Sequence, residues 1–466
     1  MRRHLPLLAV AGAAAIAVPV VAHATATNAV RTSAQTFLNA GGEPNITVSP
    51  SGKYVLADGL GSESPATLYR STDYGKHFTL TVPHVPSKGG GGDWDMHFVS
   101  EQTVVAADLD LGVGIHVDVS RDAGATWSES TVAMDVYDRP WIGAKGNNLY
   151  LVAKGFDAVP YLYSSHDLGK TFDPLPIPLY GTGPLPAEAG GTSPTPVEAL
   201  VTNQNAYVDN LTVDPKTGDV FVLYGIDPPE SYPSNPPLGA PSRLYVAHLE
   251  NGSMISHPVT PGGGTAADAF YAGFNWMTED AAGTLYVVGN GKHSNGQGSH
   301  QAPWLSYSKD KGKTWSTLVD IGTPARTSVY GAITGGTKGN VGLVYYEGTG
   351  SDANTAQNWY ATMAWVTKAD TGKPNVLRER VVAKPVHNAD ICLDGILCGA
   401  PGFGNNRNLL DYIDNTIGPD GKMWAVFASD GPATGVADSG ANNARTSTIL
   451  VKQVNGPSLG KGVVGT

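Results

Sequence analysis

The sequence contains few cysteines and few long apolar runs. Cys392 and Cys398 are the only two cysteines in 466 residues. They leave three alternatives: a disulfide, two free thiols, or half of a metal site. After the first 24 residues, no apolar run approaches the length that spans a membrane. The sequence therefore predicts no membrane span beyond its N-terminal segment.

Positive charge is also scarce. There are 30 Lys and Arg against 41 Asp and Glu, which gives a formal net charge of -11. Removal of an N-terminal leader that carries two Arg and no acidic residue makes this -13. A chain this acidic has no general attraction for nucleic acid or anionic lipid, so neither is expected as a partner.

The first 24 residues have the pattern of a secretory signal peptide. A basic start, MRR, precedes an apolar run, and the small residues AHA (22–24) follow it. A single membrane anchor is the alternative, but the run is short and Pro19 interrupts it. We expect cleavage near Ala24 and an extracellular protein. Export favours a disulfide between Cys392 and Cys398.

A short apolar segment that follows a turn recurs along the chain. Such segments are β-rich and apolar on both faces, which is typical of a strand between two packed sheets. The seven copies are SGKYVLADG (51–59), EQTVVAADL (101–109), GNNLYLVAKG (146–155), TGDVFVLYG (217–225), AGTLYVVGN (282–290), KGNVGLVYYEG (338–348) and DGKMWAVFAS (420–429).

Each copy lies within the same order of four strands, and no long amphipathic helix pattern is present. Four antiparallel strands per repeat, arranged in a ring, form a β-propeller. We therefore predict an all-β, monomeric, seven-bladed β-propeller, with residues 25–466 as a single domain. An N-terminal strand at 31–39 is expected to close the last blade, because it has no other partner and would cover an exposed edge. The blades are expected to begin near residues 43, 93, 138, 207, 271, 328 and 410, with Pro- and Gly-rich insertions at 173–199, 227–242, 290–303 and 384–408.

A second repeat has the pattern S-x-D-x-G-x-x-[WF]. Ser and Asp oxygens accept hydrogen bonds within their own turn, and Gly adopts positive φ. The final aromatic residue can pack between blades. The four copies are STDYGKHF (71–78), SRDAGATW (120–127), SHDLGKTF (165–172) and SKDKGKTW (308–315).

These four segments resemble the Asp-box, or BNR, repeat of sialidase-like propellers. In that family the boxes lie on the rim away from the ligand site. The resemblance therefore implies that Asp73, Asp122, Asp167 and Asp310 are structural and hold neither substrate nor calcium.

Ligands of propellers bind where the inner strands begin, so polar residues there are candidates. Asp93 and Asp95 are two apart on one strand and can face the same side. A water-filled channel with solvated polar walls is the alternative. The expected catalytic residues are Asp93, Asp95, Asp138, Asp411 and Tyr412, and the expected ligand-binding residues are Glu43, Arg139, Asp209, Asn210, Asn275, Arg326, Tyr330 and Arg407.

The resemblance to sialidases implies a specific site. That family holds a carboxylate with three Arg and uses a Tyr nucleophile and an Asp acid. Arg139, Arg326 and Arg407 would be the three Arg, Tyr330 or Tyr412 the nucleophile, and Asp93 or Asp138 the acid. Three features depart from the family: the R-I-P motif is missing, the predicted blades number seven instead of six, and an acidic channel mouth would repel an anionic sugar.

A different glycoside hydrolase remains open, because two carboxylates suffice for hydrolysis. Asp93, Asp95, Asp138, Asp209 and Asp411 supply the acids, while Trp94, Trp141, Tyr207, Trp276 and Tyr412 can stack on sugars, with packing favoured for Trp141 and Trp276.

No metal or cofactor is expected; calcium is the weak alternative, since carboxylates suit it but no calcium-loop motif occurs. The sequence predicts a secreted protein that acts on or binds glycans. The alternative is a non-catalytic platform for an extracellular protein partner.

Overall fold

The fold was analysed in a computed structural model of the chain. The leader at 1–24 and Asp138 lie outside the described residues, as do most residues of the predicted insertions. The structure describes residues 30–33, 35–38, 41–59, 67–81, 91–110, 114–132, 139–154, 159–179, 206–226, 243–260, 274–292, 301–393, 398, 406–434 and 446–462.

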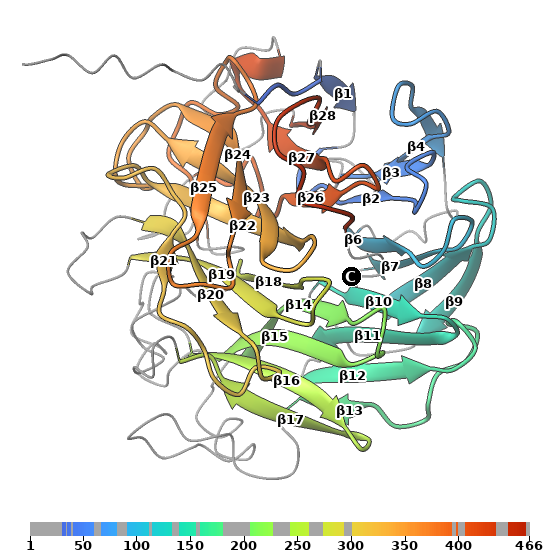
Figure 1. Cartoon of the computed structure of the whole chain (residues 1–466). Helices are drawn as coiled ribbons and strands as arrows, with labels where there is room; N and C mark the ends of the chain where they lie inside the picture. The colour runs from blue at the N-terminus through green and yellow to red at the C-terminus, as the bar shows by residue number, and fades with distance from the viewer. Residues whose placement is uncertain are drawn as a thin grey trace, which may run out of the picture.

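Seven four-stranded antiparallel sheets form the blades of a propeller around a common centre (Figure 1). The innermost strands are β2 (Ile46–Val48), β6 (Gly91–Phe98), β10 (Trp141–Lys145), β14 (Ala206–Val213), β18 (Trp276–Glu279), β22 (Ser328–Gly335) and β26 (Asp414–Ile417). The second strands are β3 (Val55–Ala57), β7 (Val104–Asp110), β11 (Asn148–Lys154), β15 (Val220–Ile226), β19 (Leu285–Lys292), β23 (Asn340–Gly348) and β27 (Met423–Ser429).

The outer strands complete each blade. The third strands are β4 (Leu68–Ser71), β8 (Gly114–Ser120), β12 (Pro160–Ser165), β16 (Arg243–Glu250), β20 (Gln301–Ser308), β24 (Trp359–Thr367) and β28 (Ser447–Lys452). The fourth strands are β5 (Thr79–Thr81), β9 (Ser128–Val132), β13 (Ile177–Pro178), β17 (Ser253–Pro258), β21 (Val319–Asp320), β25 (Asn375–Arg380) and β1 (Thr36–Leu38). A short 3-10 helix, η4 (Pro432–Thr434), follows β27.

The prediction of seven blades is confirmed, and each predicted apolar repeat contains most or all of the second strand of its blade. All seven residues of β27 are buried. Both faces of such a strand pack against neighbouring blades, which explains why these segments are apolar throughout instead of alternating.

An N-terminal strand forms the outer edge of the seventh blade. β1 pairs antiparallel with β28, with Thr36 opposite Leu450 and Leu38 opposite Thr448. Each inner strand contacts the next around the ring, and β26 contacts β2, so the ring is closed.

The antiparallel order gives the ring two distinct faces. We call the face where the inner strands begin the loop face, because connections from second to third strands and between blades lie there. The opposite face, which carries the tight turns between first and second and between third and fourth strands, is the turn face. These two names are used below.

The four S-x-D-x-G segments, here called the serine–aspartate turns, share one hydrogen-bond pattern. In the second copy, Gly124 N donates to Ser120 Oγ at 2.7 Å and Thr126 N donates to Asp122 Oδ1 at 2.8 Å. Equivalent bonds occur at Ser71 and Asp73, Ser165 and Asp167, and Ser308 and Asp310. Burial acts to raise the pKa of Asp122, but hydrogen bonds from Thr126 hold it at about 2. These carboxylates are therefore ionised and engaged by their own turns.

Each serine–aspartate turn also packs on the preceding blade. Gly75 has φ of +74°, and a Cβ there would lie 2.5 Å from the Trp424 ring of blade seven. In the same way, Gly124 faces Leu56, Gly169 faces Val117 and Gly312 faces Val246, each on the blade before it. Trp315 is buried in a core cluster that also includes residues of blade four. The turns are thus contacts between blades.

Side chains of the inner strands join each blade to the next by hydrogen bonds. Ile142 N donates to Asp95 Oδ2 at 2.7 Å, and Ile46 N donates to Asp414 Oδ2 at 2.9 Å. Met277 N donates to Asn210 Oδ1 at 3.0 Å. Similar bonds join Thr47 to Phe98, Thr278 to Gly335 and Asn415 to Gly342. Polar residues near the channel therefore satisfy backbone groups that neighbouring sheets would otherwise leave unpaired.

Cys392 and Cys398 form a disulfide, as the sequence predicts. Nearby, His387 Nδ1 lies 2.7 Å from Asp430 Oδ1, and both side chains are fully buried. Among the described residues, no helix has the length and apolarity to cross a membrane.

Replacement of Gly75 by Ala tests the contact between blades one and seven. Gly252 is the matched control, because it occupies the equivalent turn of blade four with φ of +78° and nothing within 4 Å of its Cβ position. Positive φ costs either Ala variant about 1 kcal/mol. Overlap with the Trp424 ring is expected to lower the unfolding free energy of Gly75→Ala by a further 1–3 kcal/mol or so. Urea denaturation measures the unfolding free energy of both variants. Equal losses of unfolding free energy would show that the contact with Trp424 does not restrict residue 75.

Substitution of Asp58 tests the burial of acidic groups beside the inner strands. Asp58 is 1% exposed and accepts a hydrogen bond from Asn45 N at 2.8 Å. Burial raises its pKa from 3.8 to about 8. The folded state therefore retains a proton that the unfolded state loses. The contribution of Asp58 to the free energy of unfolding is complete below pH 3.8 and disappears as the pH rises through about 8.

We expect Asp58→Asn to remove up to about 1.4 kcal/mol per pH unit from the slope of unfolding free energy between about pH 5 and 8. Asp122→Asn is the control, since the pKa of Asp122 stays at about 2. Urea denaturation across this range gives both slopes. A wild-type slope retained by Asp58→Asn would contradict the assignment.

Candidate functional site

The site on the loop face is built around the buried ion pair of Glu43 and Arg139. Arg139 Nη1 lies 3.3 Å from Glu43 Oε2, and Arg139 Nη2 donates to Trp94 O at 2.9 Å. The two side chains are 3% and 6% exposed. Glu43 precedes β2 and Arg139 precedes β10, so the pair connects blades one and three across the ring.

Blade seven contributes a second ion pair to this group. Arg407 donates from Nε to Asp411 Oδ1 at 3.2 Å and from Nη2 to Asp411 Oδ2. Asp411 N donates to Glu43 Oε1 at 3.1 Å, and Arg407 Nη2 lies 3.9 Å from the same oxygen. The side chain of Arg407 is 29% exposed, whereas that of Asp411 is 8% exposed. Arg407 is therefore the cation of the site that solvent reaches.

Asp93 supplies a third carboxylate, from blade two. Burial raises the pKa of Glu43 well above its usual value, and the nearby charge of Asp93 and a hydrogen bond with it act in the same direction. Burial also raises the pKa of Asp411, with Arg407 opposing the rise. Asp93 itself is half-buried. The site thus places a buried acid whose pKa is raised beside a more accessible carboxylate.

Aromatic rings surround the guanidinium of Arg139. Its Cζ lies 4.4 Å from the ring centroid of Tyr412 and 4.6 Å from that of Trp141. Trp141 packs edge-on against Trp276 at 5.1 Å, and Phe274 packs against Tyr412 at 5.6 Å. These rings desolvate Arg139, which strengthens its cation–π contacts. We call the whole group the Arg139 cluster: Glu43, Asp93, Arg139, Trp141, Phe274, Trp276, Tyr330, Arg407, Asp411 and Tyr412.

Irregular backbone positions lie at this cluster. The strand register shifts around Asp93 in β6, around Asp209 in β14 and around Tyr330 in β22. Glu43 and Phe274 adopt positive φ, at 45° and 63°. Bulges re-aim side chains, and unusual backbone conformations concentrate at functional sites. Sequence periodicity does not reveal either feature.

The structure brings together seven of the predicted site residues: Glu43, Asp93, Arg139, Tyr330, Arg407, Asp411 and Tyr412. Tyr330 is 3% exposed, donates its hydroxyl to Cys392 O at 3.1 Å, and has a pKa raised by burial. A buried phenol with a raised pKa is poorly suited to act as a nucleophile. Tyr412 lies over Arg139 and is the more accessible tyrosine.

Four other predicted residues take part in contacts between blades. Asp95 accepts from Ile142 N and lies 3.2 Å from His97 Nε2. Asp209 is fully buried and accepts from Asn275 N and Nδ2, while Asn210 bonds both backbone groups of Met277. Their polar atoms are engaged by the scaffold, so a catalytic role for Asp95 stays a prediction without geometric support.

Arg326 pairs with Glu347 and does not join the other two arginines that a three-arginine carboxylate site requires. Its Nη1 lies 2.8 Å from Glu347 Oε1, and Arg380 Nη2 lies 3.5 Å from the same oxygen. Glu347 belongs to the second strand of blade six. The Arg139 cluster therefore holds two of the three expected Arg.

Sequence reasoning missed Phe274, which borders the Arg139 cluster, and His97 and Asp414, which line the channel. His97 follows Asp95 by two residues and so shares its face of β6. That spacing was the available signal. Among the described residues, no group of three or more His, Cys, Asp or Glu is arranged to hold a metal ion.

The chain matches no protein-family model and no curated protein. Three solved structures with similar folds can be named. YCF48 bound to a D1 peptide is 12% identical, with 93% of this chain and 99% of that chain covered and a TM-score of 0.47. An α-L-arabinofuranosidase from Fusarium graminearum is 13% identical over 74% and 99%, with a TM-score of 0.46. A protein of unknown function from Dyadobacter fermentans is 11% identical over 91% and 99%, with a TM-score of 0.45.

Proposed function

We propose that the protein binds glycans at the Arg139 cluster and hydrolyses a glycosidic bond there. One observation carries the proposal: Glu43 has a strongly raised pKa and is hydrogen-bonded with the more accessible Asp93. A carboxyl group with a raised pKa beside a second carboxylate is an arrangement that serves acid catalysis of glycoside hydrolysis.

The roles follow from burial and partners. Glu43 and Asp93 interact through charge and a side-chain hydrogen bond, so we assign the acid to the pair and not to either residue alone. Asp411, which Arg407 holds through two hydrogen bonds, is the second carboxylate. Tyr412 and Phe274 are half-buried and offer ring faces to the apolar side of a sugar. Asp138 adjoins Arg139 in sequence and is retained as a candidate acid.

Two features support an uncharged glycan over a sialic acid. Arg139 and Arg407 already bind Glu43 and Asp411, and the predicted third arginine, Arg326, binds Glu347. An incoming carboxylate would have to replace these partners. A neutral sugar instead requires only hydrogen bonds with groups that stay paired.

A binding platform without catalysis is the second candidate. It is favoured because the charged groups of the cluster pair with one another and are little exposed: Arg139 is 4% exposed and Glu43 is 7% exposed. In this case the loop face would recognise an extracellular protein or a glycan without turnover.

A glycan array and a panel of chromogenic glycosides test both candidates. If hydrolysis occurs, Glu43→Gln and Asp93→Asn are expected to lower kcat by about 10²–10⁴, because each removes one member of the proton-holding pair. Asp167→Asn, in a serine–aspartate turn on the opposite face, is the control and should retain wild-type turnover. Binding without turnover favours the platform, and the absence of both turnover and glycan binding would exclude the carbohydrate proposal.

Export is part of the proposal. The Cys392–Cys398 disulfide supports an oxidising compartment, and residues 1–24 have the pattern of a signal peptide. Expression of the full chain in a bacterial host should yield a monomer in the periplasm or medium whose N-terminus begins near Thr25. N-terminal sequencing of that product checks this, and an uncut chain retained in membranes would contradict it.

A further inference from the structure

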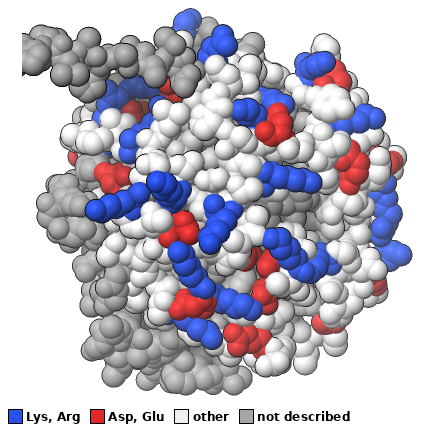
Figure 2. Space-filling model, viewed as in Figure 1, with Lys and Arg blue, Asp and Glu red and all other residues white. Residues whose placement is uncertain are grey.

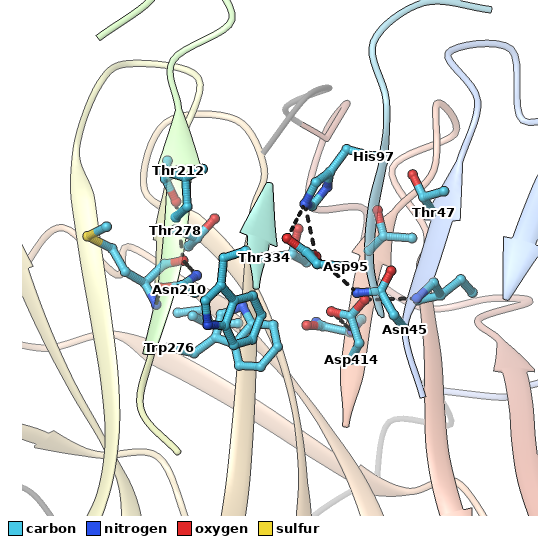
Figure 3. Close-up of a pocket in the computed structure, with 17 residues that line it drawn as sticks. Asn45, Thr47, Asp95, His97, Asn210, Thr212, Trp276, Thr278, Thr334 and Asp414 are labelled. Atoms are coloured by element: carbon cyan, nitrogen blue, oxygen red, sulfur yellow. Dashed lines mark hydrogen bonds and ion pairs between the residues drawn. The ribbon is translucent and has the colours of Figure 1, made fainter. Parts of the chain in front are cut away.

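The propeller has a channel pocket apart from the Arg139 cluster, on the turn-face side of Trp141 and Trp276. Both tryptophans line this channel pocket, and both also belong to the Arg139 cluster. Glu43, Arg139 and Asp411 are not among its lining residues. The tryptophan pair therefore separates the two sites, and we call the second one the turn-side pocket (Figure 3).

One layer of the turn-side pocket consists almost entirely of hydroxyl groups. Five of the seven inner strands carry a threonine that lines the pocket, and in four of them it lies two residues beyond Asn45, Asn210, Trp276 or Asp414. His97 occupies the same position in β6. Figure 3 shows four of these threonines with His97 around the open space. The five are Thr47, Thr212, Thr278, Thr334 and Thr416.

The acceptor groups of the pocket are already occupied. Asp95 accepts from Ile142 N, and Asp414 accepts from Ile46 N at 2.9 Å and Asn415 N at 2.7 Å. The scaffold thus uses both carboxylates of the pocket wall. A ligand that donates hydrogen bonds would find few acceptors left.

Donor groups, in contrast, remain directed at the pocket. Thr47 Oγ1 accepts from Phe98 N at 3.0 Å and Thr278 Oγ1 accepts from Gly335 N at 2.9 Å. A hydroxyl whose lone pair is used in this way keeps its proton to donate. Thr334 and Thr416 are half-buried beside the channel. Burial lowers the pKa of His97, but Asp95 and, to a smaller extent, Asp414 raise it above its usual value.

Lysines lie in the turns that surround this end of the channel. The turns between first and second strands contain Lys53, Lys216, Lys338 and Lys422, and Lys145 ends β10. Lys145 Nζ donates to Lys216 O, and Lys216 Nζ donates to Ala281 O, so these cations are fixed along the ring. Figure 2 shows Lys and Arg side chains spread around the ring centre, with acidic ones between them.

The acids of these turns are less available than the lysines. Asp214 accepts from Lys216 N at 2.6 Å, and Asp280 accepts from Ala282 N at 2.8 Å and Gly339 N at 2.7 Å. Burial raises the pKa of Glu279 to about 8, which keeps it largely uncharged at neutral pH. The mouth of the turn-side pocket is therefore more positive than the residue count suggests.

We propose that the turn-side pocket binds an oxyanion, namely a phosphate, sulfate or carboxylate group, through the threonine hydroxyls and His97, with the lysines of the surrounding turns attracting it. Oxyanions accept several hydrogen bonds and donate few. The pocket matches this because the scaffold uses its carboxylates as acceptors while its hydroxyls can donate, although Thr212 Oγ1 already donates to Met277 O at 3.5 Å. This site does not rest on the glycan proposal, because the tryptophan pair separates it from the Arg139 cluster.

Isothermal titration with inorganic phosphate, sulfate and acetate tests the proposal on the full chain. Thr334→Val and Thr416→Val keep the side-chain shape and remove the donors, and we expect the double variant to weaken binding at least tenfold or so. Lys338→Gln should weaken binding several-fold and reduce its dependence on salt. Lys373→Gln, in an outer turn of blade six, is the control that should bind as the wild type does.

A chain that ends at Gly462 is titrated alongside the full chain, to test whether the residues after Gly462 affect binding. Gly462 itself lies against Ile417 at the end of β26. Phosphate or sulfate binding that is lost in the threonine double variant supports the site, in either chain. Failure of both chains to bind any of the three anions overturns it. Equal binding by wild type and the double variant also overturns it, since the ion would then bind elsewhere.

Discussion

Hydrogen bonds from side chains of one inner strand to the backbone of the next hold the ring together. Asp95 binds Ile142 N, Asn210 binds Met277 N, and Asp414 binds Ile46 N, which closes the circle. A propeller has no continuous sheet between blades, so the backbone groups that face the centre need such partners. This requirement explains why the channel is polar without every polar residue serving a ligand.

The same constraint determines which carboxylates remain for chemistry. Asp95, Asp209 and Asp414 are engaged by backbone N–H groups, whereas Glu43, Asp93 and Asp411 meet one another and two Arg. Burial and the charge of Asp93 raise the pKa of Glu43 although Asp411 N donates to it, and burial beside Arg407 gives Asp411 a defined charged partner. The acids of one ring thus differ in the charged groups that surround them.

Trp141 and Trp276 divide the centre into two environments. On the loop face, aromatic rings and ion pairs exclude water around Arg139. On the turn face, threonines and His97 leave donors directed at an open pocket with lysines around it. The turns around the pocket contain lysines together with acidic residues, whereas the charges of the loop face are paired in the Arg139 cluster. Each face therefore suits a different class of ligand.

The sequence alone determined the number of blades and the approximate position of each second strand, because these follow from local repeats, and it favoured the disulfide. It also placed Glu43, Arg139 and Asp411 among the candidates at one end of the ring, since residues before inner strands meet there. Only the tertiary structure decided that Arg326 binds Glu347, that Asp95 binds the adjacent blade, and that bulges turn Asp93 and Tyr330. These outcomes depend on the rotation of each strand about the ring and on donors from other blades, which no local pattern encodes.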